Sequence, residues 1–147
     1  MYDILLGIHN LLRWFFLAAA VYAIFRSVNG LRRNDVFSKA DNQAGTFLLI
    51  FAHTQLLIGL ILWFMSPSVQ MALADFGNAM HTHDLRFKML EHPLTMIIAV
   101  ALIQVGRIRS KKAYSDADKF RRSLMFYSIG LILVLSRIPW NMPMWRF

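Results

Sequence analysis

Four long apolar runs dominate this chain, and each is about as long as a helix must be to cross a lipid bilayer. They cover residues 4–26, 45–65, 88–107 and 121–140. A spanning helix needs about 20 mostly apolar residues to cross about 30 Å of hydrocarbon. Backbone polar groups in lipid must be satisfied within the segment itself, which favours helices. We therefore predict an all-α integral membrane four-helix bundle that forms a single domain over residues 1–147.

The composition supports a membrane protein. Hydrophobic residues make up 57% of the chain, whereas soluble domains have about 45–50%. The chain has no cysteine, which excludes disulfides, iron–sulfur clusters, thiolate zinc sites and covalently attached c-type haem. The net charge is +8, but the basic residues gather between the apolar runs. We therefore assign them to membrane topology and expect lipid, and no nucleic acid, as a partner.

Lysine and arginine also predict the orientation. They are concentrated in the first and third connections between the runs, whereas the second connection carries only Arg86 and Lys88. Because cytoplasmic loops carry an excess of positive charge, the first and third connections are expected inside. Both termini and the second connection are then expected outside. Within that outer connection, residues 69–76 are expected to form a short helix at the membrane surface.

A histidine lies in each of three different apolar runs: His9, His53 and His92. Ionisable side chains are costly in a membrane and usually serve a function there, and histidine is a common ligand of haem iron. His9 and His92 are expected at similar shallow depths near the outer face. His53 precedes Met65 by twelve residues, which places it about 18 Å from that end. His9 and His92 are therefore the better matched pair, with His53 and one shallow histidine as the alternative.

Cations near the same level complete the pattern expected of a b-type haem site, which needs two imidazoles, an apolar slot and positive charge near the propionates. Arg86, Lys88 and Arg137 are expected toward the outer face. Arg13 lies one helical turn after His9 on the same helix face. It is near the centre of its span, where inserting an arginine into the membrane costs at least about 2.5 kcal/mol of free energy. We expect it to meet a carboxylate, a haem propionate or a quinone oxygen.

Two other interpretations use the same residues. The histidines are also suited to hydrogen bonds between helices, as in an accessory subunit without catalytic function. A metal-binding or transport protein would use a non-haem site. The candidate ligand sets for that site are His9, Glu91 and His92 in the runs, and His81, His83 and Asp84 in the outer connection.

Several segments together resemble a family of small four-span bacterial membrane proteins, frequent in Bacteroidetes-type genomes and often labelled "cytochrome b". The matching pieces are residues 6–14, 52–60, 91–93, 110–113 and 138–140, with Arg86 and Gly106. The resemblance covers nearly the whole chain except the outer connection, so it gives no role to His81 or His83. It points to His9, Arg13, His53, Arg86, Glu91 and His92 as the family's pattern.

The resemblance implies a multi-pass protein of the bacterial inner membrane that binds haem b. The expected function is electron transfer to or from quinone. By analogy with small haem bundles, we expect the chain to work beside other subunits of a respiratory complex or as a homo-oligomer.

Overall fold

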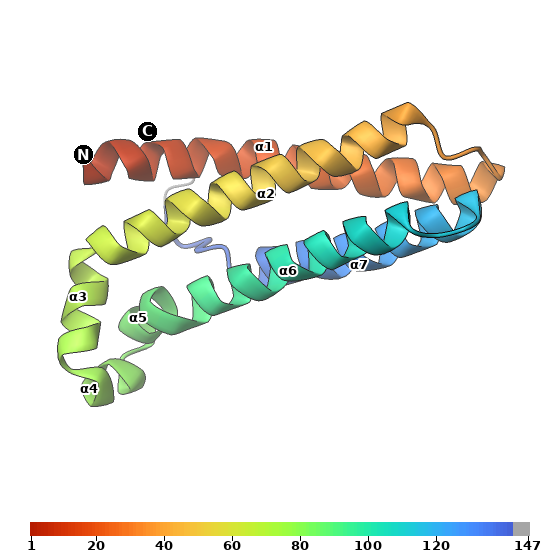
Figure 1. The fold of residues 1–147 in the computed structure, drawn as a ribbon. Helices are drawn as coiled ribbons and strands as arrows, with labels where there is room; N and C mark the ends of the chain where they lie inside the picture. Colours follow the sequence, from red (N-terminus) through yellow and green to blue (C-terminus); the bar gives the residue numbers. More distant parts are fainter. Residues whose placement is uncertain (143–147) are drawn as a thin grey trace.

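A computed structural model describes residues 1–142, which fold almost entirely into helices and contain no β-strand (Figure 1). This confirms the all-α prediction. The elements are α1 (Tyr2–Arg33), α2 (Lys39–Met65), α3 (Pro67–Ala74), α4 (Phe76–His81), α5 (His83–Arg86), the π-helical turn η1 (Phe87–Glu91), α6 (His92–Lys111) and α7 (Asp116–Ser136).

Three helical segments of residues 1–142 are long and apolar enough to cross a membrane: Tyr2–Arg33, Lys39–Met65 and His83–Lys111. They contain the first three predicted runs and support a multi-pass membrane protein. Helix α7 is not among them. It has 21 residues, but its first turns are charged, and it ends at Ser136 rather than at the predicted residue 140. The fourth span and the orientation of the termini stay predictions.

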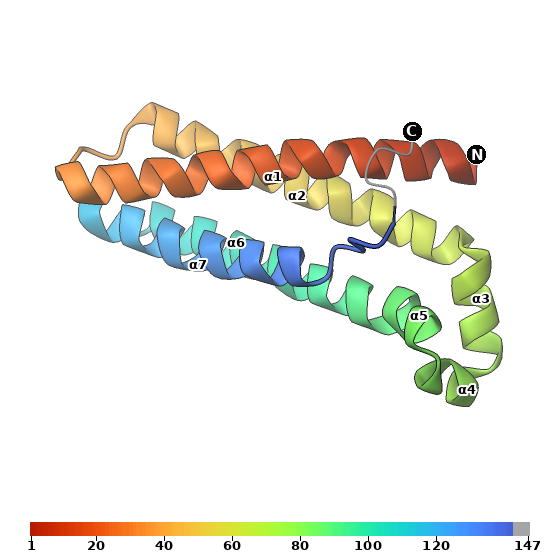
Figure 2. The same ribbon diagram turned by 180° about the vertical axis from the view of Figure 1, so that it is seen from behind.

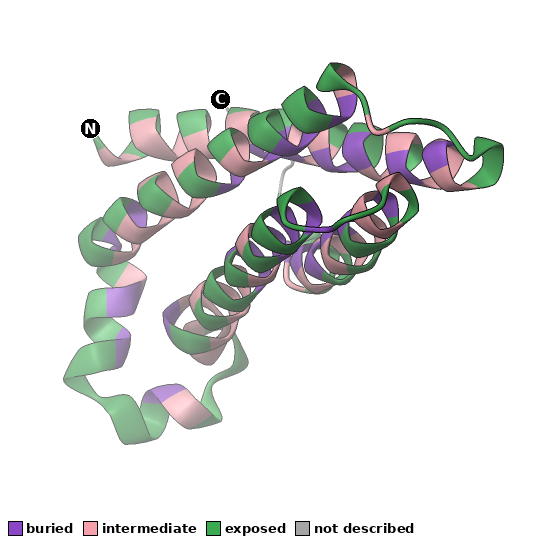
Figure 3. Cartoon of the chain, turned by 45° about the vertical axis from the view of Figure 1, so that its right-hand side comes forward, coloured by how far each residue is buried: buried purple, intermediate pink, exposed green. Residues whose placement is uncertain are grey.

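The four long helices pack as two antiparallel pairs. Helices α1 and α2 form one pair and α6 and α7 the other, and the pairs contact each other through α1 with α7 and α2 with α6 (Figures 1 and 2). Buried residues follow the inward stripe of each helix, while the outward faces are exposed (Figure 3). The shared core includes Phe16, Leu48, Ile103 and Tyr127. Because many large apolar side chains remain outside this core, the outer surface suits contact with lipid.

Short helices α3, α4 and α5 join α2 to α6 at one end of the bundle (Figure 1). Ser66 begins α3 by accepting a hydrogen bond from the Val69 backbone nitrogen at 3.5 Å, and Pro67 follows in the first turn, where its missing N–H costs little. A small apolar cluster of Ala72, Ala79 and Met89 holds the connection together. The predicted short helix at residues 69–76 is therefore present, shifted to Pro67–Ala74.

Candidate functional site

A cavity of about 470 Å³ lies among the four long helices, at the end where α1 begins and α7 finishes. This volume falls in the range of about 300–1,000 Å³ typical of small-molecule sites. Its wall is mainly apolar, with Leu6, Phe16, Met96, Val100 and Val134 among the lining residues. The polar side chains that reach it include His9 and Arg13 of α1, Gln55 of α2, Lys88 of η1 and His92 of α6.

The structure brings His9 and His92 to the same cavity, as their matched depths predicted. His53 does not line it. This residue is exposed on the side of α2, and its Nε2 lies 2.9 Å from Oε1 of Gln104 on α6. The three histidines therefore fall into two groups, one pair at the cavity and one residue on the outside of the bundle.

The ring of His92 has a defined orientation. Its Nδ1 lies 2.7 Å from the main-chain oxygen of Arg137, just beyond the end of α7. A carbonyl oxygen can only accept, so Nδ1 carries the proton and donates, which leaves the lone pair on Nε2. Histidines that ligate metals commonly donate their second ring nitrogen in this way, because the hydrogen bond fixes both tautomer and ring orientation.

A π-helical turn directly precedes His92, and Pro93 explains it. Proline has no N–H, so the carbonyl of Met89 loses its usual donor four residues later. The indole Nε1 of Trp63 on α2 donates to that carbonyl instead, at 2.9 Å. The N–H of His92 bonds back to Phe87 across the wider turn. Such turns change the helical register and are frequent at functional sites.

His9 packs against α2 at a position that only glycine leaves open. A Cβ atom on Gly59 would lie 3.1 Å from Cε1 of His9, so a larger residue there would press on the ring. The side-chain nitrogen of Gln55 donates to the main-chain oxygen of His9 at 2.9 Å, and the same nitrogen lies 3.3 Å from Nε2 of the His9 ring. The buried Nδ1 of His9 has no hydrogen-bond partner among residues 1–142. The Gln55 amide nitrogen can only donate, so Nε2 of His9 accepts and Nδ1 carries the ring proton. An unsatisfied buried donor costs about 1–3 kcal/mol, so Nδ1 suits a hydrogen-bond acceptor on a bound ligand.

Arg13 faces inward, as predicted from its position one turn after His9. Its side chain is buried and lines the cavity, and its guanidinium carbon lies 5.8 Å from the centre of the Trp14 ring. Arg13 thus adds a buried positive charge to the two imidazole rings at the cavity.

The three outer cations differ in their surroundings. Glu91 pairs with Arg86 at 2.7 Å and faces Arg137 at 3.9 Å, and neither arginine is among the residues that line the cavity. Lys88 does line the cavity, although its ammonium group also pairs with Asp84 at 2.9 Å. Lys88 and Arg13 are therefore the cations best placed for an anionic group in the cavity.

The predicted three-residue metal sets are not assembled. In the described part of the chain, histidine, aspartate and glutamate side chains form no group of three or more that could hold a metal ion. The carboxylate of Glu91 is engaged with Arg86 rather than with His9 and His92. In the outer connection, His83 stacks on Phe87 and Asp84 pairs with Lys88. The prediction of these two three-residue metal sites is therefore wrong. A site with only two histidine ligands does not depend on them.

Two polar residues near the helix interfaces were not found by sequence reasoning. Gln55 lies in the second apolar run and was given no role, yet it bridges to His9. Arg107 ends the third apolar run and was likewise given no individual role, yet it is buried in the bundle and donates to Asn42 and Thr46 of α2. Both residues are polar side chains in or beside an apolar run, and that position in the sequence could have indicated a contact between helices.

Comparisons of this chain with family models, curated proteins and solved structures find no match.

Proposed function

We propose that the chain is a multi-pass protein of the bacterial inner membrane that binds one b-type haem, with His9 and His92 as the axial ligands. One observation carries the proposal: two histidines from different helices line a single, mainly apolar cavity inside a helical bundle. Noncovalent haem sites are built from such ligand pairs, and the absence of cysteine from the sequence leaves no covalent thioether attachment.

The chain's own residues would prepare this site in three ways. The hydrogen bond to the Arg137 carbonyl holds the ring of His92 and keeps Nε2 unprotonated. The ring of His9 carries its proton on the buried Nδ1 and so keeps its lone pair on Nε2, which lies 3.3 Å from the Gln55 amide nitrogen. The apolar wall excludes water, while Arg13 and Lys88 offer positive charge to the porphyrin carboxylates. These features fit a haem.

Bound haem supplies one-electron transfer, and the protein supplies ligation, orientation and a low dielectric. We propose electron exchange with a quinone, in a respiratory assembly, as the role of this site. The resemblance of residues 6–14 and 91–93 to bacterial proteins labelled "cytochrome b" supports the same proposal.

A non-catalytic accessory subunit is the second candidate, and specific hydrogen bonds favour it. His53 bonds to Gln104 at 2.9 Å, and Gln55 and Arg137 hold the other two histidines. Each contact joins two parts of the bundle, so the histidines would serve packing alone.

The visible spectrum of the purified protein tests the proposal. Protein expressed with ample haem and purified in a mild detergent should show the reduced-minus-oxidised α band of a low-spin b-type haem. His9→Ala and His92→Ala should each lose the haem or turn it high-spin, because each removes a strong-field ligand. The matched control is His53→Ala, which should keep the wild-type spectrum.

Two outcomes would count against this assignment. Colourless wild-type protein would favour the accessory subunit and end the haem proposal. Loss of haem in His53→Ala equal to that in His9→Ala would show that the ligand pair is wrong.

A further inference from the structure

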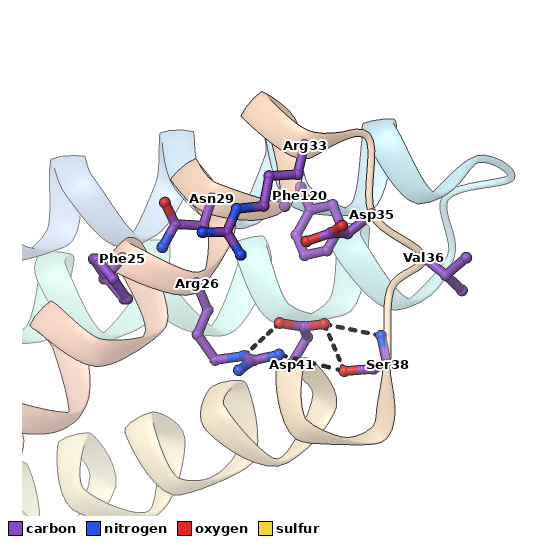
Figure 4. Close-up of a pocket in the computed structure, with 10 residues that line it drawn as sticks. Phe25, Arg26, Asn29, Arg33, Asp35, Val36, Ser38, Asp41 and Phe120 are labelled. Atoms are coloured by element: carbon purple, nitrogen blue, oxygen red, sulfur yellow. Dashed lines mark hydrogen bonds and ion pairs between the residues drawn. The ribbon is translucent and has the colours of Figure 1, made fainter.

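A second cavity, of about 550 Å³, lies at the opposite end of the bundle from the histidines. Its walls come from the last two turns of α1, the connection at residues 34–38, the first turn of α2 and Phe120 of α7 (Figure 4). Asn34 closes α1 in the left-handed conformation, with φ 53° and ψ 42°, and turns the chain around the cavity. None of the residues discussed for haem takes part in it.

The length of α1 places this cavity at the level of lipid headgroups. Helix α1 has 32 residues and is therefore about 48 Å long, whereas the hydrocarbon core of a bilayer measures about 30 Å. The apolar part ends before Arg26, so residues 26–33 extend beyond the hydrocarbon by roughly 12 Å. This extension forms one wall of the cavity.

One pair of charges in the cavity is already satisfied. Arg26 donates from Nε to Asp41 Oδ1 at 2.6 Å, and Ser38 donates to Asp41 Oδ2 from both its backbone nitrogen and its hydroxyl, each at 2.8 Å. Asp41 is buried. This group fixes the start of α2 against α1 and contributes no net charge to the cavity.

A second pair of charges has no such contact. Within residues 1–142, the side chains of Arg33 and Asp35 make neither a hydrogen bond nor an ion pair, although both line the cavity and both are exposed. Figure 4 shows Asn29 and Arg33 on the last turns of α1 and Asp35 on the connection that follows, and no dashed line joins Arg33 to Asp35. The cavity therefore presents one cation and one anion that are not paired with each other.

The rim of the same cavity is apolar. Phe25 is 61% exposed and Val36 is 74% exposed, and both belong to the cavity lining. A polar chamber beside exposed apolar side chains is suited to an amphiphile whose head enters the chamber and whose chains stay outside.

We propose that this cavity binds a zwitterionic phospholipid whose headgroup carries a phosphate and a primary ammonium, that is, a phosphoethanolamine headgroup. Arg33 and Asn29 donate to the phosphate, because a guanidinium matches phosphate oxygens in a bidentate manner. Asp35 accepts from the ammonium, and Phe25 and Val36 contact the acyl chains. A purely anionic headgroup would leave Asp35 facing negative charge. The site is independent of haem binding.

The test is lipid retention by the purified full-length protein. The protein is reconstituted in vesicles of equal parts phosphatidylethanolamine and phosphatidylglycerol, extracted in mild detergent, and its bound lipid is measured by native mass spectrometry. The wild type should retain phosphatidylethanolamine in clear excess. Arg33→Gln should lower that retention at least about tenfold, because the loss of even one charge-assisted hydrogen bond costs about that factor. Asp35→Asn should abolish the preference between the two lipids.

Arg32→Gln is the matched control, because Arg32 is exposed in the same helical turn but does not line the cavity. It should behave as the wild type. Equal retention of both lipids by the wild type would overturn the proposal, as would the same loss in Arg32→Gln and Arg33→Gln. Complete displacement of the lipid by millimolar phosphoethanolamine without acyl chains would show a soluble ligand and also overturn it. All these residues are exposed, and unchanged helical circular dichroism verifies folding.

Discussion

Replacement of Arg107 by methionine tests how the two helix pairs are joined at the end away from the histidines. Arg107 is only 4% exposed. Its Nη2 lies 2.6 Å from Asn42 Oδ1, 3.1 Å from Asn42 O and 3.1 Å from Thr46 Oγ1. One side chain of α6 thus reaches two successive turns of α2.

The expected cost follows from these contacts. Nη2 has two hydrogens, so it makes at most two full bonds, each worth about 1.5–3 kcal/mol when the donor is charged. Part of this is offset, because removal of the guanidinium also removes the cost of burying it. Asn42 and Thr46 are exposed and can bond to water again. We therefore expect Arg107→Met to lower the free energy of unfolding by about 2–3 kcal/mol.

Unfolding in mixed micelles with increasing SDS measures this cost. Arg109→Met is the control, because Arg109 is exposed on the same helix and should change stability by less than about 0.5 kcal/mol. A double-mutant cycle of Arg107→Met with Asn42→Ala should give a coupling energy of about 1–2 kcal/mol. A coupling near zero, or equal losses for the two arginines, would refute the reasoning.

Three further outcomes are expected. Gly106→Ala should destabilise the protein by about 1–3 kcal/mol more than Gly77→Ala in the same unfolding assay. A Cβ atom at Gly106 would collide with Cβ of Phe126, whereas a Cβ atom at Gly77 would enter open space. Equal stabilities of the two variants would contradict this packing. Glu91→Gln should cost no more than about 1 kcal/mol, because its ion pair with Arg86 is partly exposed, and a loss of several kcal/mol would contradict that view. A reporter fused to the C-terminus should read out as external, and a cytoplasmic signal would disprove the orientation predicted from lysine and arginine.

The helices, and the level of their side chains along the bundle, could be predicted because both depend on position along one segment. The apolar runs gave the helical segments, and a rise of about 1.5 Å per residue brought His9 and His92 to one level. Contacts between helices also depend on how each helix is rotated about its axis, which the runs specify poorly because they are apolar on nearly all sides. For this reason the outward position of His53 and its bond to Gln104 were not predicted.

Helix ends depended on local polar contacts rather than on hydrophobicity. The first run was placed at residues 4–26, but α1 continues to Arg33 until Asn34 reverses the chain. Likewise, Glu91 was considered as a metal ligand, although a carboxylate between Arg86 and Arg137 is better compensated there. The π-helical turn at Phe87–Glu91 also escaped prediction, because it requires an indole from another helix to replace the donor that proline lacks.

The π-helical turn has a consequence for how this chain tolerates changes in length. A π turn contains one residue more than the α-helical turn it replaces, so deleting a single residue such as Leu90 would return this segment to α-helical spacing, although Pro93 would still lack its N–H. The deletion would rotate everything before the turn by about 100° relative to α6. Lys88 would then no longer face the cavity. His92 would keep its position, because it follows the deleted residue and belongs to α6.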